Sequence, residues 1–293
     1  MSIYNTLSDT SKKKFVVLID PDKPSDEQIL EIVERSKKAG VDFFFVGGSL
    51  LLTDSLDHCI KLIKAHCDIP VLIFPGDSLQ ISKWCDGFLL LSLISGRNSE
   101  MLIGRHVVAA PYLKLYGNEI IPTGYILVDG GRQTSVSYMS NTTPIPHDKD
   151  AIAMCTALAG EMLGLKVIYM DAGSGAIEPI SNEMIGKVKQ TISIPLIVGG
   201  GIKTPEKVSE MAKAGADIIE TNTFSANRIS GKITVSATAG ARGFYAYDSF
   251  AVTDMSKMNL SVSGSYAYGI EVKESLEVSA TGLNLGKIPV NAK

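Results

Sequence analysis

The chain has 293 residues, of which 45% are hydrophobic and 20% charged, and its formal net charge is -3. This length can form one large domain, or one domain of about 220 to 250 residues with an appendage. The slight acidic excess argues against a nucleic-acid-binding protein, because such proteins normally carry a basic excess. The sequence contains no apolar run of membrane-spanning length and no signal-peptide core, so we expect a cytoplasmic protein.

The first two thirds of the chain alternate between short apolar runs and helix-like segments. "SDEQILEIVERSKKAG" has Ser25 as a candidate N-cap and ends on Gly40, and "TPEKVSEMAKAGAD" begins with Thr204 and Pro205. Runs rich in β-branched or aromatic residues predict parallel strands, which are buried on both faces. These eight runs cover residues 15–20, 42–48, 69–75, 87–92, 124–131, 166–173, 194–201 and 216–223.

This alternation is typical of the α/β class, and eight strand–helix units predict a (β/α)8 barrel over residues 1–223. Two units are irregular. The first follows the fourth strand at residues 93–110, and the second is a long loop rich in Ser, Thr and Pro at residues 132–148. A long loop in a compact domain is more often functional than idle, so we expect the second segment to contribute to a site.

A different pattern begins after Phe224. Small polar residues alternate with apolar ones, and residues 260–280, "LSVSGSYAYGIEVKESLEVSA", have a period near two. This pattern predicts antiparallel strands joined by glycine turns. Residues 224–293 are therefore expected to form a β-rich C-terminal extension whose function and packing the sequence leaves open. The amphipathic helix that would complete a barrel after its last strand is not evident.

In barrels of this type, chemistry takes place where the strands end at their carboxyl termini. The predicted sixth and seventh strands end in "YMDAGSGA" and "VGGGI", and the eighth ends in "TNT". Glycines allow backbone N–H groups to approach an anion closely, and the following helix N-termini add their dipoles. These turns predict a phosphate site, although the same residues could form tight turns with no ligand.

Two carboxylates at this end are candidates for chemistry. Asp20 ends the first strand and could hold Mg²⁺ together with Ser49, because Mg²⁺ prefers hard oxygen ligands and bridges to substrate phosphates. The alternative is a plain Asp-Pro-Asp turn. Asp171 could act as a general base or orienting acceptor for a substrate hydroxyl, with Tyr169 donating a hydrogen bond beside it. Asp171 could instead cap its own loop.

Several motifs, "LIDPDK", "FFVGGSLL", "SLISGRN", "YMDAGSGA" and "PLIVGGGI", occur in this order. Through them, residues 5–223 resemble the geranylgeranylglyceryl phosphate synthase family, and in particular its archaeal and Bacteroidetes-type branch. The shorter PcrB-type heptaprenylglyceryl phosphate synthases are related. The resemblance implies a modified TIM barrel that uses Mg²⁺ to join sn-glycerol 1-phosphate to a polyprenyl diphosphate. The products would be an ether-lipid precursor and diphosphate.

The resemblance also implies site residues and partners. Asp20 and Ser49 would lie at the Mg²⁺ ion and the diphosphate. An apolar groove would hold the prenyl chain, with residues 43–45 and 88–91 as candidates, although core packing is the alternative role for them. Such an enzyme would make transient contact with a membrane surface and could form homo-oligomers. The glycerol phosphate would contact Tyr169, Met170, Asp171, Ala172, Gly173, Ser174, Gly175, Gly200, Gly201, Asn222 and Thr223.

The chain departs from the family pattern in two motifs. The family commonly has Glu where this chain has Asp171, and a glycine-containing turn where this chain has "TNTF".

Two alternative functions stay open. One is an isomerase or lyase of sugar phosphates, which would need a second acid or base opposite Asp171, and none is evident in the sequence. The other is an inactive barrel that carries a β-rich interaction module.

Overall fold

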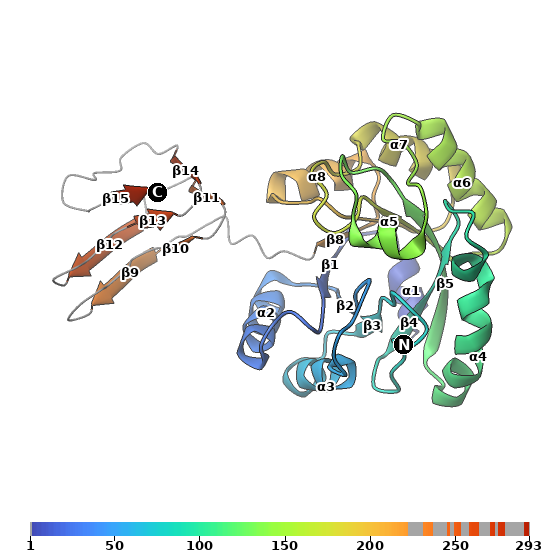
Figure 1. The fold of residues 1–293 in the computed structure, drawn as a ribbon, viewed down its shortest axis with the longest axis horizontal. Helices are drawn as coiled ribbons and strands as arrows, with labels where there is room; N and C mark the ends of the chain where they lie inside the picture. The colour runs from blue at the N-terminus through green and yellow to red at the C-terminus, as the bar shows by residue number, and fades with distance from the viewer. Residues whose placement is uncertain are drawn as a thin grey trace. The chain divides into compact units, whose positions relative to one another are not determined.

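The computed structural model describes residues 2–221 and seven short strands between residues 231 and 292. Contacts divide the chain into two units, Met1–Phe224 and Ser225–Lys293, which we describe separately. In the first unit, eight parallel strands pair in chain order and close between the last and the first (Figure 1). The predicted barrel is therefore confirmed. Its strands are β1 (Lys14–Ile19), β2 (Phe43–Val46), β3 (Val71–Ile73), β4 (Gly87–Leu93), β5 (Glu119–Leu127), β6 (Val167–Asp171), β7 (Leu196–Gly199) and β8 (Ile218–Thr221).

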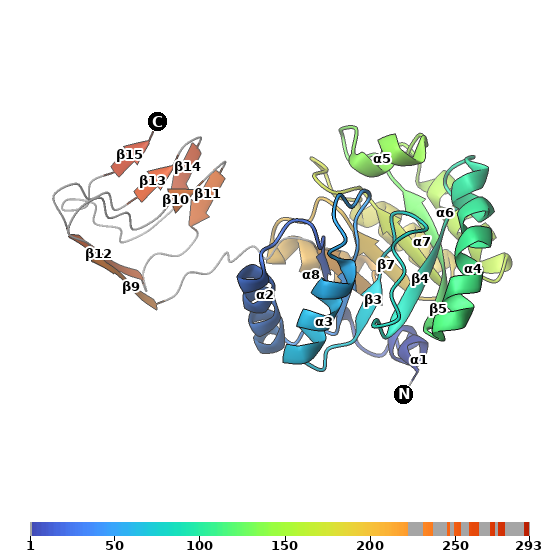
Figure 2. The same ribbon diagram turned by 60° about the horizontal axis from the view of Figure 1, so that its bottom comes forward.

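Helices surround the outside of this barrel (Figure 2). The sequence signals for two of them are confirmed: a capping box of Ser25 and Gln28 begins α2, and Thr204 accepts a hydrogen bond from the backbone of Lys207 at the start of α8. The helical elements are α1 (Ile3–Ser8), α2 (Asp26–Ala39), α3 (Leu56–His66), the π-helix η1 (Glu100–Gly104), α4 (Arg105–Tyr116), α5 (Ser135–Ser140), α6 (Asp150–Met162), α7 (Asn182–Thr191) and α8 (Pro205–Ala214).

The strands are buried on both faces, and successive side chains point to opposite sides. In β6, Val167 and Tyr169 belong to the apolar cluster inside the barrel, whereas Ile168 and Met170 pack in the cluster beneath the helices. Asp171 therefore faces the barrel interior. The pairing of β5 with β6 places Tyr125 opposite Tyr169. This alternation between inward-facing and outward-facing positions decides which polar side chains can meet at the mouth of the barrel.

One strand connection lacks the helix that a regular barrel would have. Residues 74–86, which join β3 to β4, contain no helix. At the opposite end of the barrel, α1 covers the opening: the Glu119 carboxylate accepts hydrogen bonds from the Ser2 hydroxyl at 2.6 Å and the Ile3 N–H at 2.7 Å. Leu7 from α1 is fully buried in the interior cluster. The barrel is thus closed at its base and less covered on one side.

The second unit contains the strands β9 (Gly231–Ser236), β10 (Tyr245–Ala246), β11 (Ser249–Val252), β12 (Met258–Ser263), β13 (Ile270–Val272), β14 (Ser275–Val278) and β15 (Val290–Ala292). They pair in parallel as β9 with β12, β11 with β14, and β10 with β13 and β15. The prediction of antiparallel strands is therefore wrong. In parallel and antiparallel sheets alike, successive side chains of a strand point to opposite faces. Alternation of polar and apolar residues therefore does not distinguish the two directions of pairing.

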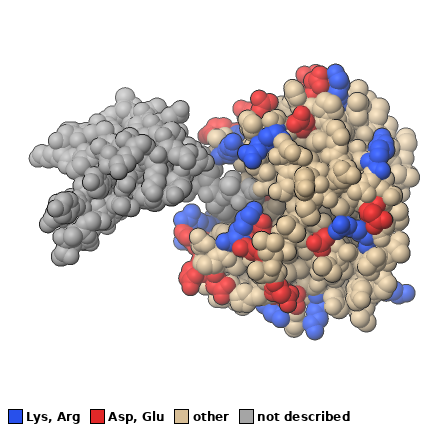
Figure 3. Space-filling model, in the orientation of Figure 1, with Lys and Arg blue, Asp and Glu red and all other residues tan. Residues whose placement is uncertain are grey.

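On the face of the molecule in Figure 3, acidic and basic side chains are interspersed among uncharged ones. The positions predicted at the end of the eighth strand, Asn222 and Thr223, lie outside the described residues.

Candidate functional site

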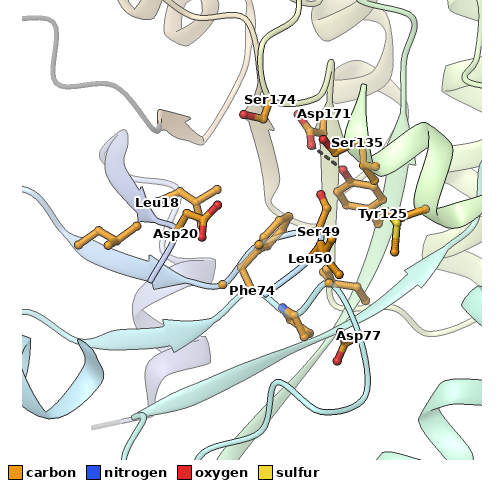
Figure 4. A pocket seen from close by; sticks show the side chains of 18 of the residues that line it. Leu18, Asp20, Ser49, Leu50, Phe74, Asp77, Tyr125, Ser135, Asp171 and Ser174 are labelled. Carbon is orange, nitrogen blue, oxygen red and sulfur yellow. Dashed lines mark hydrogen bonds between the residues drawn. The ribbon is translucent and has the colours of Figure 1, made fainter. Parts of the chain in front are cut away.

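A pocket of about 940 Å³ lies at the carboxyl ends of the strands, the end where the sequence predicted the chemistry. Its volume is in the range of small-molecule sites. Figure 4 shows Asp20 and Asp171 on opposite sides of this pocket, with Phe74 and Ser49 between them. Its polar lining includes Asp20, Ser49, Asp77, Tyr125, Ser135, Asp171, Ser174 and Glu220.

Two pairs of a phenol and a carboxyl group form the floor of the site. The Tyr125 hydroxyl donates a hydrogen bond to Asp171, whose other oxygen accepts the Gly173 N–H at 2.6 Å (Figure 4). The Tyr169 hydroxyl donates to the Glu220 carboxyl at 2.8 Å. The phenol beside Asp171 is thus Tyr125, and the predicted place of Tyr169 is wrong. Tyr169 is only 1% exposed and supports Glu220 from below.

Burial controls the charge of both carboxyl groups. It raises the pKa of Asp171, while the hydrogen bonds from Tyr125 and Gly173 act in the opposite direction. Burial and the nearby charge of Asp171 raise the pKa of Glu220 to about 8, against the hydrogen bond from Tyr169. Two neighbouring buried carboxyl groups do not ionise together easily. The charge of Asp171 thus disfavours ionisation of Glu220, whereas the hydrogen bonds from Tyr125 and Gly173 favour the ionised form of Asp171.

Aromatic rings hold the two phenols in place. The ring centroids of Tyr125 and Tyr169 lie 5.6 Å apart, and those of Phe74 and Tyr169 lie 4.9 Å apart. Phe74, at the end of β3, also lies 6.0 Å from Tyr125. Contacts at these distances stabilise aromatic pairs beyond their burial. The phenol hydroxyls are thus positioned by packing before any ligand binds.

The glycines after β7 make room for the carboxyl groups. A Cβ atom at Gly199 would lie 2.3 Å from Glu220 Oε2 and 2.5 Å from the Tyr169 hydroxyl. A Cβ atom at Gly200 would lie 2.4 Å from Asp171 Oδ1, and Gly200 also has a φ of +80°, which favours glycine. The sequence predicted these glycines as a phosphate cradle. The structure adds that they are needed for the buried acids themselves.

Asp20 and Ser49 both line the pocket, as the sequence predicted. The Asp20 carboxylate pairs with Lys23 at 2.9 Å and keeps a side-chain exposure of 22%. A Cβ atom at Gly48 would lie 3.2 Å from it, so a larger residue there would crowd the carboxylate. Asp22 has a different role: it accepts hydrogen bonds from Ser55, Thr53 and the backbone of Leu52 and so anchors the loop after β2.

The donor set fits Mg²⁺ only if a ligand completes it. Within the described residues, no group of three His, Cys, Asp or Glu side chains could hold a metal. Asp20 and Ser49 nevertheless offer hard oxygens in an accessible pocket. Mg²⁺ is usually bound in this way, through one or two protein oxygens, water and substrate phosphates.

The other half of the pocket is apolar. The segment without a helix contributes Phe74 and Pro75, and the irregular segment after β4 contributes Met101 and Ala109. The long loop predicted to be functional contains α5 and contributes Ser135, Val136, Met139 and Ser140 to the pocket lining. The phenylalanines at 43–45 are fully buried in the core and do not line the pocket. On this side the apolar lining includes Phe74, Pro75, Phe88, Leu90, Leu91, Leu93, Met101, Ala109, Val136 and Met139, and further apolar lining residues are Leu18, Ile19, Pro24, Ile32 and Leu50.

The remaining predicted residues differ in whether their side chains face the barrel interior or the surrounding helices. Ser174, Gly175 and Gly200 line the pocket, but Met170 and Ala172 pack in the helix-facing cluster, so their side chains do not reach it. Sequence reasoning missed Tyr125 and Glu220. Tyr125 is an inward-facing polar residue in the fifth strand run, and Glu220 is a charged residue inside an otherwise apolar run. A charged residue in a buried strand is itself a signal, because such groups are rarely buried without a partner.

These features define a barrel protein with an enzyme-like site, in which buried acids and glycine turns adjoin an apolar chamber. A sequence model of the PcrB family matches residues 8–237, and the chain belongs to that family. It is 56% identical over 220 residues to the geranylgeranylglyceryl phosphate synthase of Chitinophaga pinensis, covering 74% of this chain and 87% of that protein. For the enzyme of the same name from Spirosoma linguale the identity is 51% over 219 residues, covering 75% and 88%.

A solved structure of the same kind is also similar. It is (S)-3-O-geranylgeranylglyceryl phosphate synthase from Thermoplasma acidophilum, in complex with the substrate sn-glycerol-1-phosphate. It is 37% identical to this chain, with a TM-score of 0.72, over 75% of this chain and 90% of that one.

We predict that Gly199→Ala destabilises the barrel by about 1–3 kcal/mol, because the new methyl group collides with Glu220 and Tyr169. Urea unfolding monitored by circular dichroism measures this change. Gly186→Ala in α7 is the matched control, since its nearest contact would be an ordinary 3.4 Å. Alanine is favoured over glycine in a helix, so the control should be neutral or more stable. Equal effects of the two substitutions would contradict the prediction.

Proposed function

We propose that this protein is a prenyltransferase that joins sn-glycerol 1-phosphate to geranylgeranyl diphosphate, or a similar polyprenyl diphosphate. The observation that carries the proposal is the position of the Asp171 carboxylate, buried between glycine turns and an apolar chamber. A polyol phosphate and a long hydrocarbon need such neighbouring environments. Two relatives that are 56% and 51% identical to this chain bear the name of this activity.

The reaction forms one bond and breaks another at the first carbon of the prenyl chain. The 3-hydroxyl oxygen of the glycerol attacks this allylic carbon, and the bond from the carbon to diphosphate breaks. Asp171 accepts the hydroxyl proton, for which its raised pKa is suited. Tyr125 orients the carboxylate through its hydrogen bond, while the N–H of Gly173 holds the second oxygen.

We further propose that Mg²⁺ is the cofactor and that Asp20 and Ser49 would hold it with the diphosphate. The ion would neutralise charge on the leaving group. The Asp20 carboxylate lies across the pocket from Asp171 (Figure 4), which suits a leaving group and a nucleophile that approach the same carbon from two sides.

The chamber lined by β4, η1 and α4 suits the prenyl chain. Burial of an unbranched or methyl-branched hydrocarbon is favourable by about 25 cal/mol for each Å² removed from water. The irregular segment 93–110 and the helix-free segment 74–86 both contribute to this lining. The chain length of the natural substrate depends on how far this chamber extends.

An isomerase or lyase reaction requires a second acid or base near Asp171. No such residue is evident in the sequence, but Glu220 lines the pocket together with Asp171, so the expectation that a second acid is missing was wrong. We still favour prenyl transfer because the apolar chamber would be unnecessary for a small sugar phosphate. The similarity of the family members named above supports the same choice.

The decisive assay uses the purified chain with radiolabelled sn-glycerol 1-phosphate, geranylgeranyl diphosphate and Mg²⁺. We expect label to enter the organic phase, and sn-glycerol 3-phosphate to be a poor substrate. We predict that Asp171→Asn lowers kcat by about 10²–10⁴-fold, because the amide cannot accept the proton. Asp171→Glu keeps a carboxylate and should retain more activity. Turnover of Asp171→Asn at the wild-type rate would contradict the role of the base.

A second prediction concerns the cation. Chelation by EDTA should abolish product formation, and Asp20→Asn should raise the Mg²⁺ concentration for half-maximal activity by about tenfold or more, since one charged ligand is lost. Asp26→Asn at the exposed start of α2 is the matched control and should leave this concentration unchanged. An unaltered Mg²⁺ requirement in Asp20→Asn would exclude the proposed ligand.

We also propose transient contact with a membrane surface through the loops at the mouth. Leu52 after β2 is 82% exposed and Leu79 after β3 is 88% exposed. They belong to the loops that contribute Leu50 and Ser78 to the pocket lining. Among the described residues, no helix is long and apolar enough to cross a membrane.

The apolar face of α4, with Val107, Tyr112 and Leu115 exposed, is a candidate surface for self-association.

The membrane contact can be tested with vesicles that carry the prenyl substrate. We predict that Leu52→Ser together with Leu79→Ser weakens vesicle binding by about tenfold or more, because two exposed leucines no longer bury their side chains in lipid. Sedimentation with phosphatidylcholine vesicles measures this. Leu163→Ser, 80% exposed after α6 at the other end of the barrel, is the matched control. Equal binding by all three proteins would contradict the proposal.

A further inference from the structure

Glu220 carries a polar atom that the mechanism above does not use. The residue lies on β8, is 3% exposed and lines the pocket together with Asp171 and Gly200. One oxygen, Oε2, accepts the Tyr169 hydroxyl at 2.8 Å. The other oxygen, Oε1, is buried and has no hydrogen-bond partner among the described residues. Leaving a buried polar atom unpaired is costly, and native proteins rarely do so without a reason.

The surroundings of Glu220 contain acids and phenols. Asp171 and Tyr169 face it from β6, and Tyr125 on β5 points its hydroxyl at Asp171. On β7 the neighbour is Gly199, and on β1 the register partner is Val16. The buried cation of β1, Lys14, lies opposite Ile218 toward the base of the barrel and donates to the Asp9 carbonyl. Burial and the charge of Asp171 raise the pKa of Glu220 to about 8, so the carboxyl group is neutral at pH 7.

The hydrogen bond from Tyr169 indicates which oxygen of the neutral group carries the proton. Oε2 accepts from the phenol, so the proton belongs on Oε1, the oxygen without a partner. A neutral carboxyl group of this kind is a hydrogen-bond donor. Glu220 is part of the pocket lining, so a molecule bound there is the candidate partner of this donor.

We propose that Glu220 is a substrate-binding residue whose Oε1 donates a hydrogen bond to an oxygen of the bound polyol phosphate. The inference rests on the proposed function and extends it. Asp171 acts as the acceptor for a hydroxyl, and Glu220 acts as a donor beside it, so the two acids have opposite tasks. Placing two carboxyl groups in environments that separate their protonation states is a general way to obtain an acid and a base in one site.

An ionised Glu220 would lose this donor and would also repel a phosphate dianion. The affinity for the polyol phosphate should therefore fall as the pH rises through the range in which Glu220 loses its proton. The phosphate group itself has its second pKa near 6, so it stays a dianion above pH 7 and does not contribute to this change.

The test measures the binding of sn-glycerol 1-phosphate to the full chain by isothermal titration calorimetry from pH 7 to pH 9.5 at constant ionic strength. The wild-type Kd should rise by about tenfold or more over this range, as a required proton is lost. Glu220→Gln, whose amide donates at every pH, should keep a nearly constant Kd. Glu220→Met, of similar size without a donor, should bind about tenfold more weakly at pH 7 and show no pH dependence.

Asp217→Asn is the matched control. Asp217 is a buried carboxylate just before β8 that pairs with Lys189 at 2.7 Å, far along the strand from the pocket. Its loss reduces stability but should leave the wild-type pH profile of binding intact. Infrared difference spectra provide a second readout: the carbonyl band of a protonated carboxyl group should be present in the wild type and absent in Glu220→Gln.

Methyl phosphate, a monoester whose second pKa is also near 6, serves as a second probe that identifies the acceptor. A pH-dependent Kd for both ligands assigns the hydrogen bond to a phosphate oxygen, and a pH-dependent Kd for sn-glycerol 1-phosphate alone assigns it to a glycerol oxygen. A wild-type Kd that is constant from pH 7 to pH 9.5, or wild-type affinity in Glu220→Met, overturns the inference while the proposed function stands. Absence of binding by every folded variant at every pH overturns both.

Discussion

The burial of two carboxyl groups side by side is the constraint on which the site depends. Asp171 and Glu220 face the interior of the barrel, where water is excluded and two negative charges would repel each other strongly. Each is therefore paired with a phenol from the strands β5 and β6. The phenols need aromatic neighbours, and the carboxyl groups need glycines opposite them. The burial of these two acids thus determines which residues are suitable on the four strands β5 to β8.

Much of the barrel could be predicted from the sequence, because its strands are short apolar runs separated by helix signals. All eight runs overlap a strand, although β5 begins five residues before its run, and the capping residues of α2 and α8 act as predicted. The end of the barrel that carries the site followed from the same pattern. These features depend on local propensity and on burial of whole segments, both of which are properties of neighbouring residues.

The partners within the site could not be predicted in the same way, because they depend on pairing between strands that are far apart in the sequence. Tyr169 and Asp171 are neighbours in the chain, yet their hydroxyl and carboxylate bond to Glu220 and Tyr125, which come from other strands. Met170 was included with them because it lies between them in sequence, although alternation directs it to the helices. The direction of strand pairing in the C-terminal unit was missed for the same reason.

The connection between β3 and β4 has a consequence for how this protein family can vary. The polar floor is built from β5 to β8 and their glycine turns, whereas the apolar chamber is built from β4, η1, α4 and the helix-free segment 74–86. Phe74 belongs to both parts, because it lines the chamber and packs on Tyr125 and Tyr169. Away from Phe74, the wall of the chamber can change in depth without moving the two acids or their phenols.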